Sequence, residues 1–363
     1  MPPHSRQESR CNDIRVVGAM ISDPPAPAVE ECANKINTNL GDPVSYPGMN
    51  EAIKSIISRV SREALGKEYP GWVTSGATES NLLALYYWRE RGKNKLILLE
   101  SAHYSVLKAA KILGLKYHVI PLKPSSCAPA RKLTEVVDHK SIVVATIGTT
   151  ELGCIDDVRG MAEIAEKVGA AIHVDAAFLG PIMRYIVPPV MIELNDTVAT
   201  LALDMHKIPE APLPLGVLLA SDQTIIESLY TQSSYIPSGR QFGILGSRPG
   251  CPVYAALRSI ETLEKMFGSF EGIAEALNRE AERITRELGK CGYRRISPPG
   301  RPILCLQHPN IDKIFKKASQ MGIQLYKCTA PKGVRLVVMP HHIYNRETDC
   351  ILELLSRFAS VSD

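Results

Sequence analysis

The sequence has no apolar run of the roughly 18 to 20 residues that a membrane-spanning helix needs. Its first residues, MPPHSRQESRCND, also lack the hydrophobic core of a secretory signal peptide. Lysine and arginine number 42 against 38 acidic residues, and they form no basic block that would indicate nucleic-acid binding. We therefore expect a cytoplasmic protein that binds neither a membrane nor a nucleic acid.

Pairs of closely spaced cysteines are also missing. The nine cysteines are scattered from Cys11 to Cys350 without a CxxC motif, which argues against a disulfide framework and against a structural zinc site. We expect most of them to be small buried apolar residues and expect no metal, although the cytosol of a thermophile permits a bridge. The chain shows no internal repeat and no low-complexity tract.

The pattern of apolar residues predicts alternating helices and strands. The chain of 363 residues, 45% hydrophobic, is long enough for one large domain and a smaller one. From about Asn50 onward, helical and strand-like segments alternate, and the short apolar strands indicate a mostly parallel seven-stranded sheet with helices on both faces. The expected strands include GWVTSG, KLILLE, SIVVATIG, AIHVDAA, TVATLALD and GVLLAS.

After Pro249 the pattern changes to long amphipathic helices, near 252–267, 270–290 and 311–321, with the strands ILCLQ and VRLVVMP and a final helix. This predicts a small α+β domain. The Pro-rich first segment, with little periodicity, indicates an arm that packs on another part. The predicted division is an arm over 1–47, a large α/β domain over 48–265 and a small domain over 266–363.

Polar residues that follow the predicted strands suit a pyridoxal-phosphate enzyme. Such an enzyme needs a lysine for the Schiff base, an acid beside the pyridine nitrogen, an anion nest and a group that stacks on the ring. Asp175 ends the strand AIHV, and Lys207 follows the next strand, where open α/β sheets bind ligands. Taken singly, each is more often a cap, a salt-bridge partner or a surface group.

The anion nest is predicted at the turn Ser75-Gly76-Ala77-Thr78, before the helix ESNLLALYYW, because backbone N–H groups at a helix start bind phosphate. A simple N-cap is the alternative. His103, just past another strand, is the stacking candidate, and a helix cap is the alternative there too. Thr149 and Thr150 end the strand SIVVAT, where a hydroxyl can reach the phenolic oxygen of the cofactor.

Eight segments together resemble one family, and the likeness extends in order from about residue 37 to the C-terminus. They are NTNLGDPVSYPG, TSGATESN, SAHYSV, GTTELGCIDD, HVDAAFLG, DMHK, GILGSRPG and VRLVVMPHH. They resemble the group II pyridoxal-phosphate-dependent decarboxylases, and most closely the archaeal L-tyrosine/L-aspartate decarboxylases. The resemblance implies the fold-type I architecture of aspartate aminotransferase and a homodimer with active sites at the subunit interface.

The resemblance also implies roles for individual residues. Lys207 would carry the cofactor as a Schiff base, Asp175 would pair with the pyridine nitrogen, and His103 would stack on the ring and shuttle a proton. Ala177 would pack on the opposite ring face, and Ser247 would reach the phosphate of the neighbouring subunit. The remaining positions that match cofactor-binding residues are Gly76, Ala77, Thr78, Thr150, Asp204 and His206.

Substrate contacts are predicted from the same likeness. Tyr235 lies where relatives have a mobile loop with a tyrosine that protonates the substrate carbon, and Arg335 lies where fold-type I enzymes bind the α-carboxylate. Asn39, Asp42 and Tyr46 are candidate lining residues of the pocket, although Asn-Leu-Gly-Asp-Pro equally suits a turn. Further candidates for a second carboxylate are Arg240, Arg248 and His341.

The expected reaction is decarboxylation of L-aspartate to β-alanine, which serves coenzyme A biosynthesis. The alternatives are L-tyrosine, giving tyramine, and L-glutamate. A carbon–carbon lyase of the sphingosine-phosphate lyase type, a desulfurase acting through Cys154 or Cys328, and a non-catalytic binding protein are the other classes. Glu210, in the unusual segment IPEAPLPLG after the lysine, is expected to alter the pocket.

Overall fold

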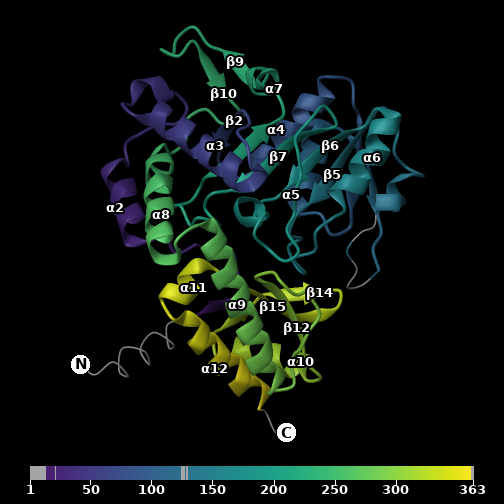
Figure 1. Cartoon of the computed structure of the whole chain (residues 1–363), viewed down its shortest axis with the longest axis vertical. Coiled ribbons are helices and arrows are strands. Elements are labelled where there is room, and N and C mark those ends of the chain that lie inside the picture. Colours follow the sequence, from purple (N-terminus) through teal and green to yellow (C-terminus); the bar gives the residue numbers. More distant parts are fainter. Residues whose placement is uncertain (1–13, 21, 124–126, 128–129, 361–363) are drawn as a thin grey trace.

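A seven-stranded sheet forms the centre of the larger part of the molecule (Figure 1). The computed structural model describes residues 14–20, 22–123, 127 and 130–360. The strand order is β2-β8-β7-β6-β5-β3-β4, and only β8 runs antiparallel to its neighbours. The strands are β2 (Gly71–Thr74), β3 (Lys95–Leu99), β4 (Lys116–Ile120), β5 (Ser141–Thr146), β6 (Ala171–Asp175), β7 (Val198–Asp204) and β8 (Gly216–Ala220).

Helices cover both faces of this sheet, as the continuous apolar strands predicted. Alternate residues of β3 separate into two hydrophobic clusters: Leu96 and Leu98 pack with α5 (Tyr104–Leu113), whereas Ile97 and Leu99 belong to the main core. The other helices of this part are α3 (Met49–Leu65), α4 (Ala77–Arg89), α6 (Val158–Val168), α7 (Gln223–Glu227) and α8 (Cys251–Phe267). The predicted mostly parallel sheet between helical layers is confirmed.

The C-terminal elements form a second, smaller group below the sheet in Figure 1. Its antiparallel sheet has the order β11-β12-β15-β14. The strands are β11 (Arg294–Arg295), β12 (Ile303–Gln307), β14 (Lys327–Thr329) and β15 (Lys332–Val337). The helices are α9 (Phe270–Gly289), α10 (Ile311–Gln320), α11 (Pro340–Tyr344) and α12 (Glu347–Ala359). These bounds agree with the predicted helices, and we retain the division at residues 265 and 266 as a proposal.

The predicted arm has more regular structure than its sequence indicated. Strand β1 (Val16–Val17) pairs in parallel with β13 (Gln324–Leu325), next to the C-terminal sheet. Helix α2 (Ala26–Asn34) then packs against α8. The arm therefore contacts both groups of elements. No helix among the described residues is long and apolar enough to cross a membrane.

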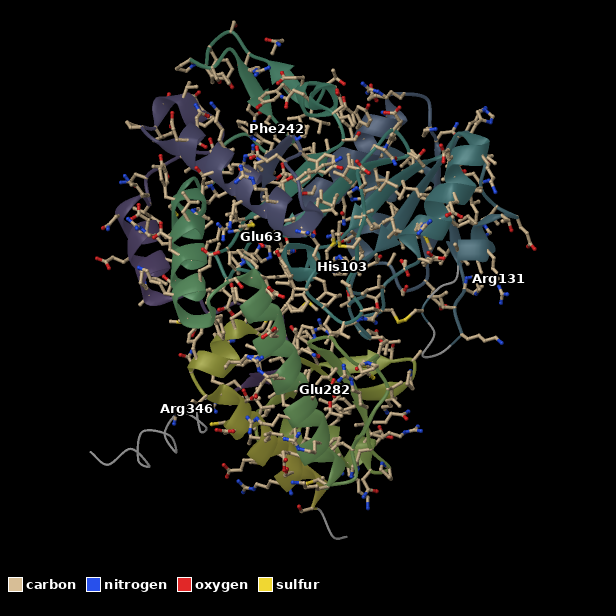
Figure 2. The ribbon with its side chains drawn as sticks, in the orientation of Figure 1. Glu63, His103, Arg131, Phe242, Glu282 and Arg346 are labelled. Carbon is tan, nitrogen blue, oxygen red and sulfur yellow. A yellow bond between two sulfur atoms is a disulfide. The ribbon has the colours of Figure 1, made fainter. Side chains whose placement is uncertain are left out.

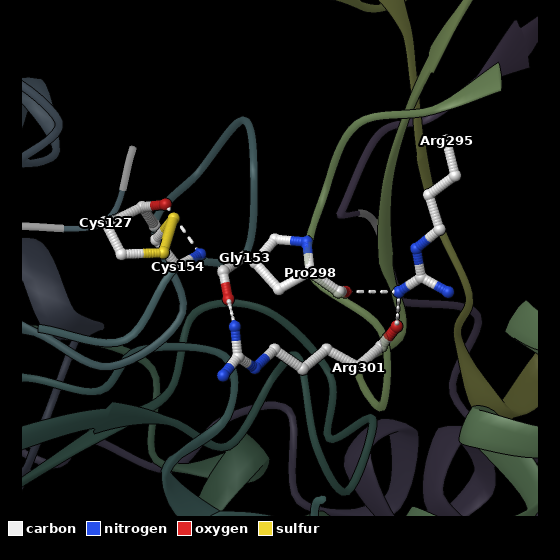
Figure 3. The surroundings of a disulfide bond; sticks show 7 residues. Cys127, Gly153, Cys154, Arg295, Pro298 and Arg301 are labelled. Carbon is white, nitrogen blue, oxygen red and sulfur yellow. Dashed lines mark hydrogen bonds between the residues drawn. A yellow bond between two sulfur atoms is a disulfide. The ribbon is translucent and has the colours of Figure 1, made fainter. Parts of the chain in front are cut away.

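One cysteine pair among the described residues forms a bridge, although the scattered spacing had argued against a disulfide framework. Cys127 and Cys154 form a disulfide that closes a sequence separation of 27 residues (Figure 3). The neighbouring Gly153 carbonyl accepts a hydrogen bond of 3.3 Å from Arg301. Sequence spacing missed the bridge because the two cysteines meet only after β5 and the turn that follows it have packed together.

Candidate active site

A cavity of about 270 Å³ lies at the carboxyl ends of the central strands. Thr146, Asp175 and Asp204, the last residues of β5, β6 and β7, all face it. Parallel strands bring their carboxyl ends to one edge of the sheet, so residues far apart in sequence meet there. The other lining residues are Met20, Ser75, Gly76, Ala77, Thr78, His103, Tyr104, Gly148, Thr150, Ala177, Phe178, His206 and Lys207.

Lys207 enters this cavity from the loop after β7. Its Nζ lies 2.8 Å from Asp204 Oδ2, and its side chain is only 18% exposed. The adjacent His206 is fixed through Nδ1, which lies 2.8 Å from the Leu215 carbonyl. Burial lowers the pKa of His206. The lysine is therefore held next to a carboxylate in a cleft, as its place after the strand predicted.

The turn before α4 is held by the same carboxylate. Asp204 Oδ1 accepts a hydrogen bond of 2.6 Å from the Ala77 backbone N–H, at the first turn of α4. The N-cap position is Gly76, which has no side chain, so the simple Ser or Thr cap does not form. The Ala77 N–H was predicted to bind an anion at this turn, but it is already bound by Asp204. The predicted anion nest therefore has one backbone donor fewer than expected. The exposed Thr78 lines the cavity at this point.

Asp175 is almost fully buried, with 3% of its surface exposed. Its Oδ1 accepts a hydrogen bond of 3.1 Å from the Ala177 backbone. Its Oδ2 accepts one of 2.8 Å from Asn81 Nδ2, which comes from α4. Such donors stabilise the ionised carboxylate, and an ionised carboxylate is what a protonated pyridine nitrogen needs as a partner.

His103 lies near the middle of the molecule, between the sheet and the C-terminal elements (Figure 2). It is the N-cap of α5, because its side chain accepts from the Ser105 backbone N–H, so the helix-cap alternative is also correct. Its ring faces the cavity and lies 4.1 Å from the Tyr104 ring, centroid to centroid. Burial lowers the pKa of His103, despite the opposite effect of Asp175.

A second cavity of about 420 Å³ adjoins the first and shares His103, Tyr104 and Thr150 with it. Arg335 lies beside this junction, where its Nε donates to the Thr150 carbonyl and its Nη1 donates to the Gly18 carbonyl at 2.7 Å. The adjoining cavity offers space for a substrate side chain. The cysteine Cys154 on its wall is in the disulfide.

The cavity is not lined by five of the predicted residues, which are Asn39, Asp42, Tyr46, Ser247 and Tyr235. Asn39 Oδ1 accepts from the backbones of Gly41 and Arg248, and it therefore joins the arm to a loop. Tyr46 packs half-buried against the main core. Ser247 is exposed, and Tyr235 is 88% exposed between β9 (Tyr230–Gln232) and β10 (Arg240–Phe242). Their predicted roles in the active site stay predictions.

The candidates for a second carboxylate are bound elsewhere. Arg240 pairs with Glu227, and the buried Arg248 lies 3.4 Å from Glu79. His341 pairs with Glu210, its Nδ1 lying 2.5 Å from Glu210 Oε1. Glu210 is therefore turned into the protein and does not line the cavity, contrary to the expectation that it would alter the pocket.

The proposed reactive thiols are not in a reactive state. Cys154 is oxidised, and Cys328 is fully buried, with its Sγ 3.4 Å from the Glu151 carbonyl. The side-chain hydrogen bond of the Cys328 thiol to Cys305, together with burial, raises the pKa of Cys328. A nucleophilic thiol needs the opposite shift, so this geometry disfavours a desulfurase.

The cavity fits pyridoxal phosphate on its own chemistry. It combines a lysine, a buried carboxylate and an imidazole with a helix start, and Thr146 Oγ1 at its wall is buried without a partner among the described residues. Sequence reasoning missed Met20, Tyr104 and Phe178 on the wall and Asn81 behind it. Met20 could not be found because it reaches the site through the pairing of β1 with β13 and the hydrogen bond from Arg335 to Gly18, which are contacts between distant segments.

Comparisons with known proteins agree with this chemistry. Residues 33–244 match the pyridoxal-dependent decarboxylase conserved domain. A probable L-tyrosine/L-aspartate decarboxylase of Methanopyrus kandleri is 29% identical, covering 97% of this chain and 98% of the relative. A probable L-aspartate decarboxylase of Halobacterium salinarum is 31% identical, covering 90% of this chain and 91% of the relative.

Solved structures share the fold. A sphingosine-1-phosphate lyase of Burkholderia pseudomallei has a TM-score of 0.81 at 18% identity, covering 98% of this chain and 88% of that one. A glutamate decarboxylase of Lactobacillus brevis has a TM-score of 0.80 at 17% identity, covering 100% of this chain and 94% of that one. The expected fold-type I architecture is confirmed.

Proposed function

The chain belongs to the family of pyridoxal-dependent decarboxylases, and on that premise we propose that it converts L-aspartate to β-alanine. It is a pyridoxal-phosphate-dependent carboxy-lyase that acts on an amino acid. The observation that carries the proposal is the cavity in which Lys207, Asp175 and His103 meet. L-Aspartate is supported by the names of the relatives, and β-alanine would serve coenzyme A biosynthesis.

The residues of the cavity divide the work of holding the cofactor. Lys207 Nζ would bind its aldehyde carbon and Asp175 would pair with its ring nitrogen, since both residues line the cavity. The hydroxyl of Thr78, at the start of α4, would bind its phosphate. Bound pyridoxal phosphate supplies an electron sink for the negative charge that remains when carbon dioxide leaves.

Two further residues act on the substrate in this proposal. Arg335, which is 4% exposed, lies beside Thr150 and orients a carboxylate of the substrate. Two of its N–H groups already donate to backbone carbonyls, so fewer remain for the substrate. This modest hold suits a leaving carboxylate, because tight binding of the ground state would slow its loss. His103, which lines the cavity, would stack on one face of the ring and exclude water from it.

Release of carbon dioxide tests the proposal directly. Protein loaded with pyridoxal phosphate is incubated with L-aspartate, L-glutamate or L-tyrosine, and carbon dioxide and the amine product are measured by mass spectrometry. Lys207→Ala should abolish release, whereas Lys67→Ala, an exposed lysine paired with Glu193, should not. Release from tyrosine or glutamate would reassign the substrate and keep the reaction class.

A carbon–carbon lyase is the second candidate, because a solved lyase has the same fold. The lyase would cleave between Cα and Cβ and give an aldehyde without carbon dioxide. An aldehyde from a phosphorylated amino alcohol, with no carbon dioxide from any amino acid, would replace the decarboxylase proposal with this one.

We also propose a homodimer with its active sites at the interface. The exposure of Ser247 and Tyr235, with the apolar Ile244 and Leu245 also exposed, supports it. Sedimentation equilibrium should give twice the mass of the 39.8 kDa chain. A monomer that retains decarboxylase activity would refute it.

A further inference from the structure

Behind the cavity wall, one buried amide joins the two residues that face the cofactor. Asn81, on α4, is 1% exposed and does not line the cavity. Its Nδ2 lies 2.8 Å from Asp175 Oδ2 and 3.0 Å from Ser105 Oγ. Ser105 Oγ in turn lies 2.8 Å from His103 Nδ1. Asn81 therefore contacts Asp175 directly and His103 through one hydroxyl.

The other end of this amide is also held. Asn81 Oδ1 lies 2.8 Å from Nε2 of His173, a fully buried residue of β6. His173 Nδ1 lies 2.8 Å from Thr200 Oγ1 on β7. Burial lowers the pKa of His173 to about 3, so the ring is neutral and carries one N–H.

These contacts allow only one arrangement of hydrogens. A carboxylate accepts only, so the Asn81 NH₂ must face Asp175, and its Oδ1 must accept from His173 Nε2–H. The neutral His173 then accepts at Nδ1 from the Thr200 hydroxyl. Ser105 Oγ accepts the second Asn81 N–H, and its own hydrogen is free to donate to His103.

His103 is the far end of this ordered chain. Its Nδ1 also accepts from the Ser105 backbone N–H at 3.3 Å, so Nδ1 cannot carry a hydrogen. The proton of the neutral ring must then be on Nε2. The same amide thus donates to Asp175 and, through Ser105, favours a His103 whose only N–H is at Nε2.

We propose that Asn81 is a positioning residue that orders the polar groups behind the cofactor, fixing the orientation of the Asp175 carboxylate and holding His103 in its Nε2–H tautomer. The proposal rests on the proposed function, because it assumes that both residues face bound pyridoxal phosphate. Asn81 acts only through Asp175 and Ser105, since the cavity wall separates it from the cofactor.

Substitutions separate the contact of Asn81 with Asp175 from its contact with His103 through Ser105. Asn81→Leu preserves the approximate size but removes both donors and the acceptor, so Asp175 and His173 each lose a partner. Ser105→Ala cuts only the branch to His103. Asn81→Asp retains an acceptor for His173 but needs a proton to face Asp175. The control is Ser61→Ala on α3, which removes a part-buried hydrogen bond to the Lys67 carbonyl and a buried one from the Tyr69 N–H, and which alters none of the contacts of Asn81.

The readouts are the dissociation constant of pyridoxal phosphate and the pH dependence of its visible absorption band. Loss of one hydrogen bond to a charged group, worth about 1.5–3 kcal/mol, should raise the dissociation constant of Asn81→Leu roughly 10- to 150-fold. Asn81→Asp should bind more weakly as the pH rises. Ser105→Ala should bind nearly as wild type but shift the Nδ1 ¹⁵N resonance of His103, because Nδ1 loses the hydroxyl while it still accepts from the backbone N–H.

The controls distinguish the possible failures. Ser61→Ala should lower thermal stability without changing cofactor affinity or the absorption band. Should the wild type show no absorption band with pyridoxal phosphate, the proposed function fails. Should the wild type show the band while Asn81→Leu and Asn81→Asp both match its affinity and pH profile, Asn81 has no positioning role. ¹⁵N shifts that place the His103 proton on Nδ1 would also overturn the proposal.

Discussion

The buried pair of Glu210 and His341 joins the loop after Lys207 to the C-terminal part of the chain. Glu210 Oε1 lies 2.5 Å from His341 Nδ1, and Tyr344 donates to Oε2 at 3.2 Å. The Glu210 side chain is fully buried and that of His341 is 8% exposed. We predict that Glu210→Ala destabilises the fold strongly, because it leaves a buried imidazole without its partner.

The size of the effect follows from the burial. Removing one partner of a buried charged pair costs about 3–5 kcal/mol. The entropy of unfolding is about 2.1 cal/mol/K per residue, so for 363 residues this cost lowers Tm by roughly 4–7 °C. Glu210 has a φ of 62°, and alanine preserves its Cβ, so backbone strain is unchanged. Glu210→Gln, which retains neutral hydrogen bonds, should lose only about 1 kcal/mol.

The pair also predicts a pH dependence. Burial lowers the pKa of His341, but the hydrogen bond and charge of Glu210 outweigh it, so the pKa is raised above its ordinary value of 6.5. Burial raises the pKa of Glu210, and the hydrogen bond and charge of His341 offset only part of this increase. The folded state therefore binds more protons than the unfolded state. This stabilisation is complete below about pH 6.5 and is lost as the pH rises through the folded pKa of His341.

Urea unfolding of the wild type and both variants between pH 6 and 9 measures these effects. The advantage of the wild type over Glu210→Gln should be largest at pH 6 and should shrink as the pH rises. Asp312→Ala, which breaks the exposed pair with Lys332, is the control and should change little. A loss below about 1 kcal/mol for Glu210→Ala, or equal pH slopes for all variants, would refute this account of the pair.

Three further predictions concern other parts of the fold. Gly76→Ala should weaken cofactor binding in equilibrium dialysis, because its φ is +123° and a Cβ would lie 3.3 Å from Asp204 Oδ1; unchanged affinity would mean that the turn tolerates a side chain. Burial raises the pKa of Asp156 to about 7, so its stabilising contribution is lost between about pH 4 and 7. In thermal unfolding, Asp156→Asn should therefore be more stable than the wild type at pH 8 but not at pH 4. An equal difference in stability at both pH values would count against a raised pKa of the buried Asp156 carboxyl. Cys127→Ser should lower the free energy of unfolding by about 3.5 kcal/mol, because it opens a loop of 27 residues. Reductant should lower the free energy of unfolding of the wild type by more than that of the variant, in which the disulfide of Cys350 remains to be reduced.

Strand-end residues were predictable because the pattern of a parallel sheet constrains them. A short apolar run predicts a strand, and parallel strands end at one edge, so Asp175, Asp204 and Lys207 had to lie near one another. His103 was found for the same reason, since it follows β3. The helix bounds followed from apolar periodicity, which reports the face that packs on the core.

Contacts between distant segments were not predictable. The hydrogen bond from Asn81 to Asp175 spans 94 residues, and that from Ala77 to Asp204 spans 127. Neither leaves a periodic signal, because a single buried polar contact depends on the distance between two packed elements. The disulfide and the place of Met20 at the cavity depend on packing in the same way.

The sequence by itself therefore determined the order of the elements, the sheet and the residues at its carboxyl edge, because local apolar patterns encode them. Only the tertiary structure decided which partner each polar group meets. It turned Glu210 away from the pocket toward His341 and placed Asn81 between Asp175 and Ser105. A buried polar group must find a partner, and its partner is whichever group the packing of the whole chain brings within hydrogen-bond distance.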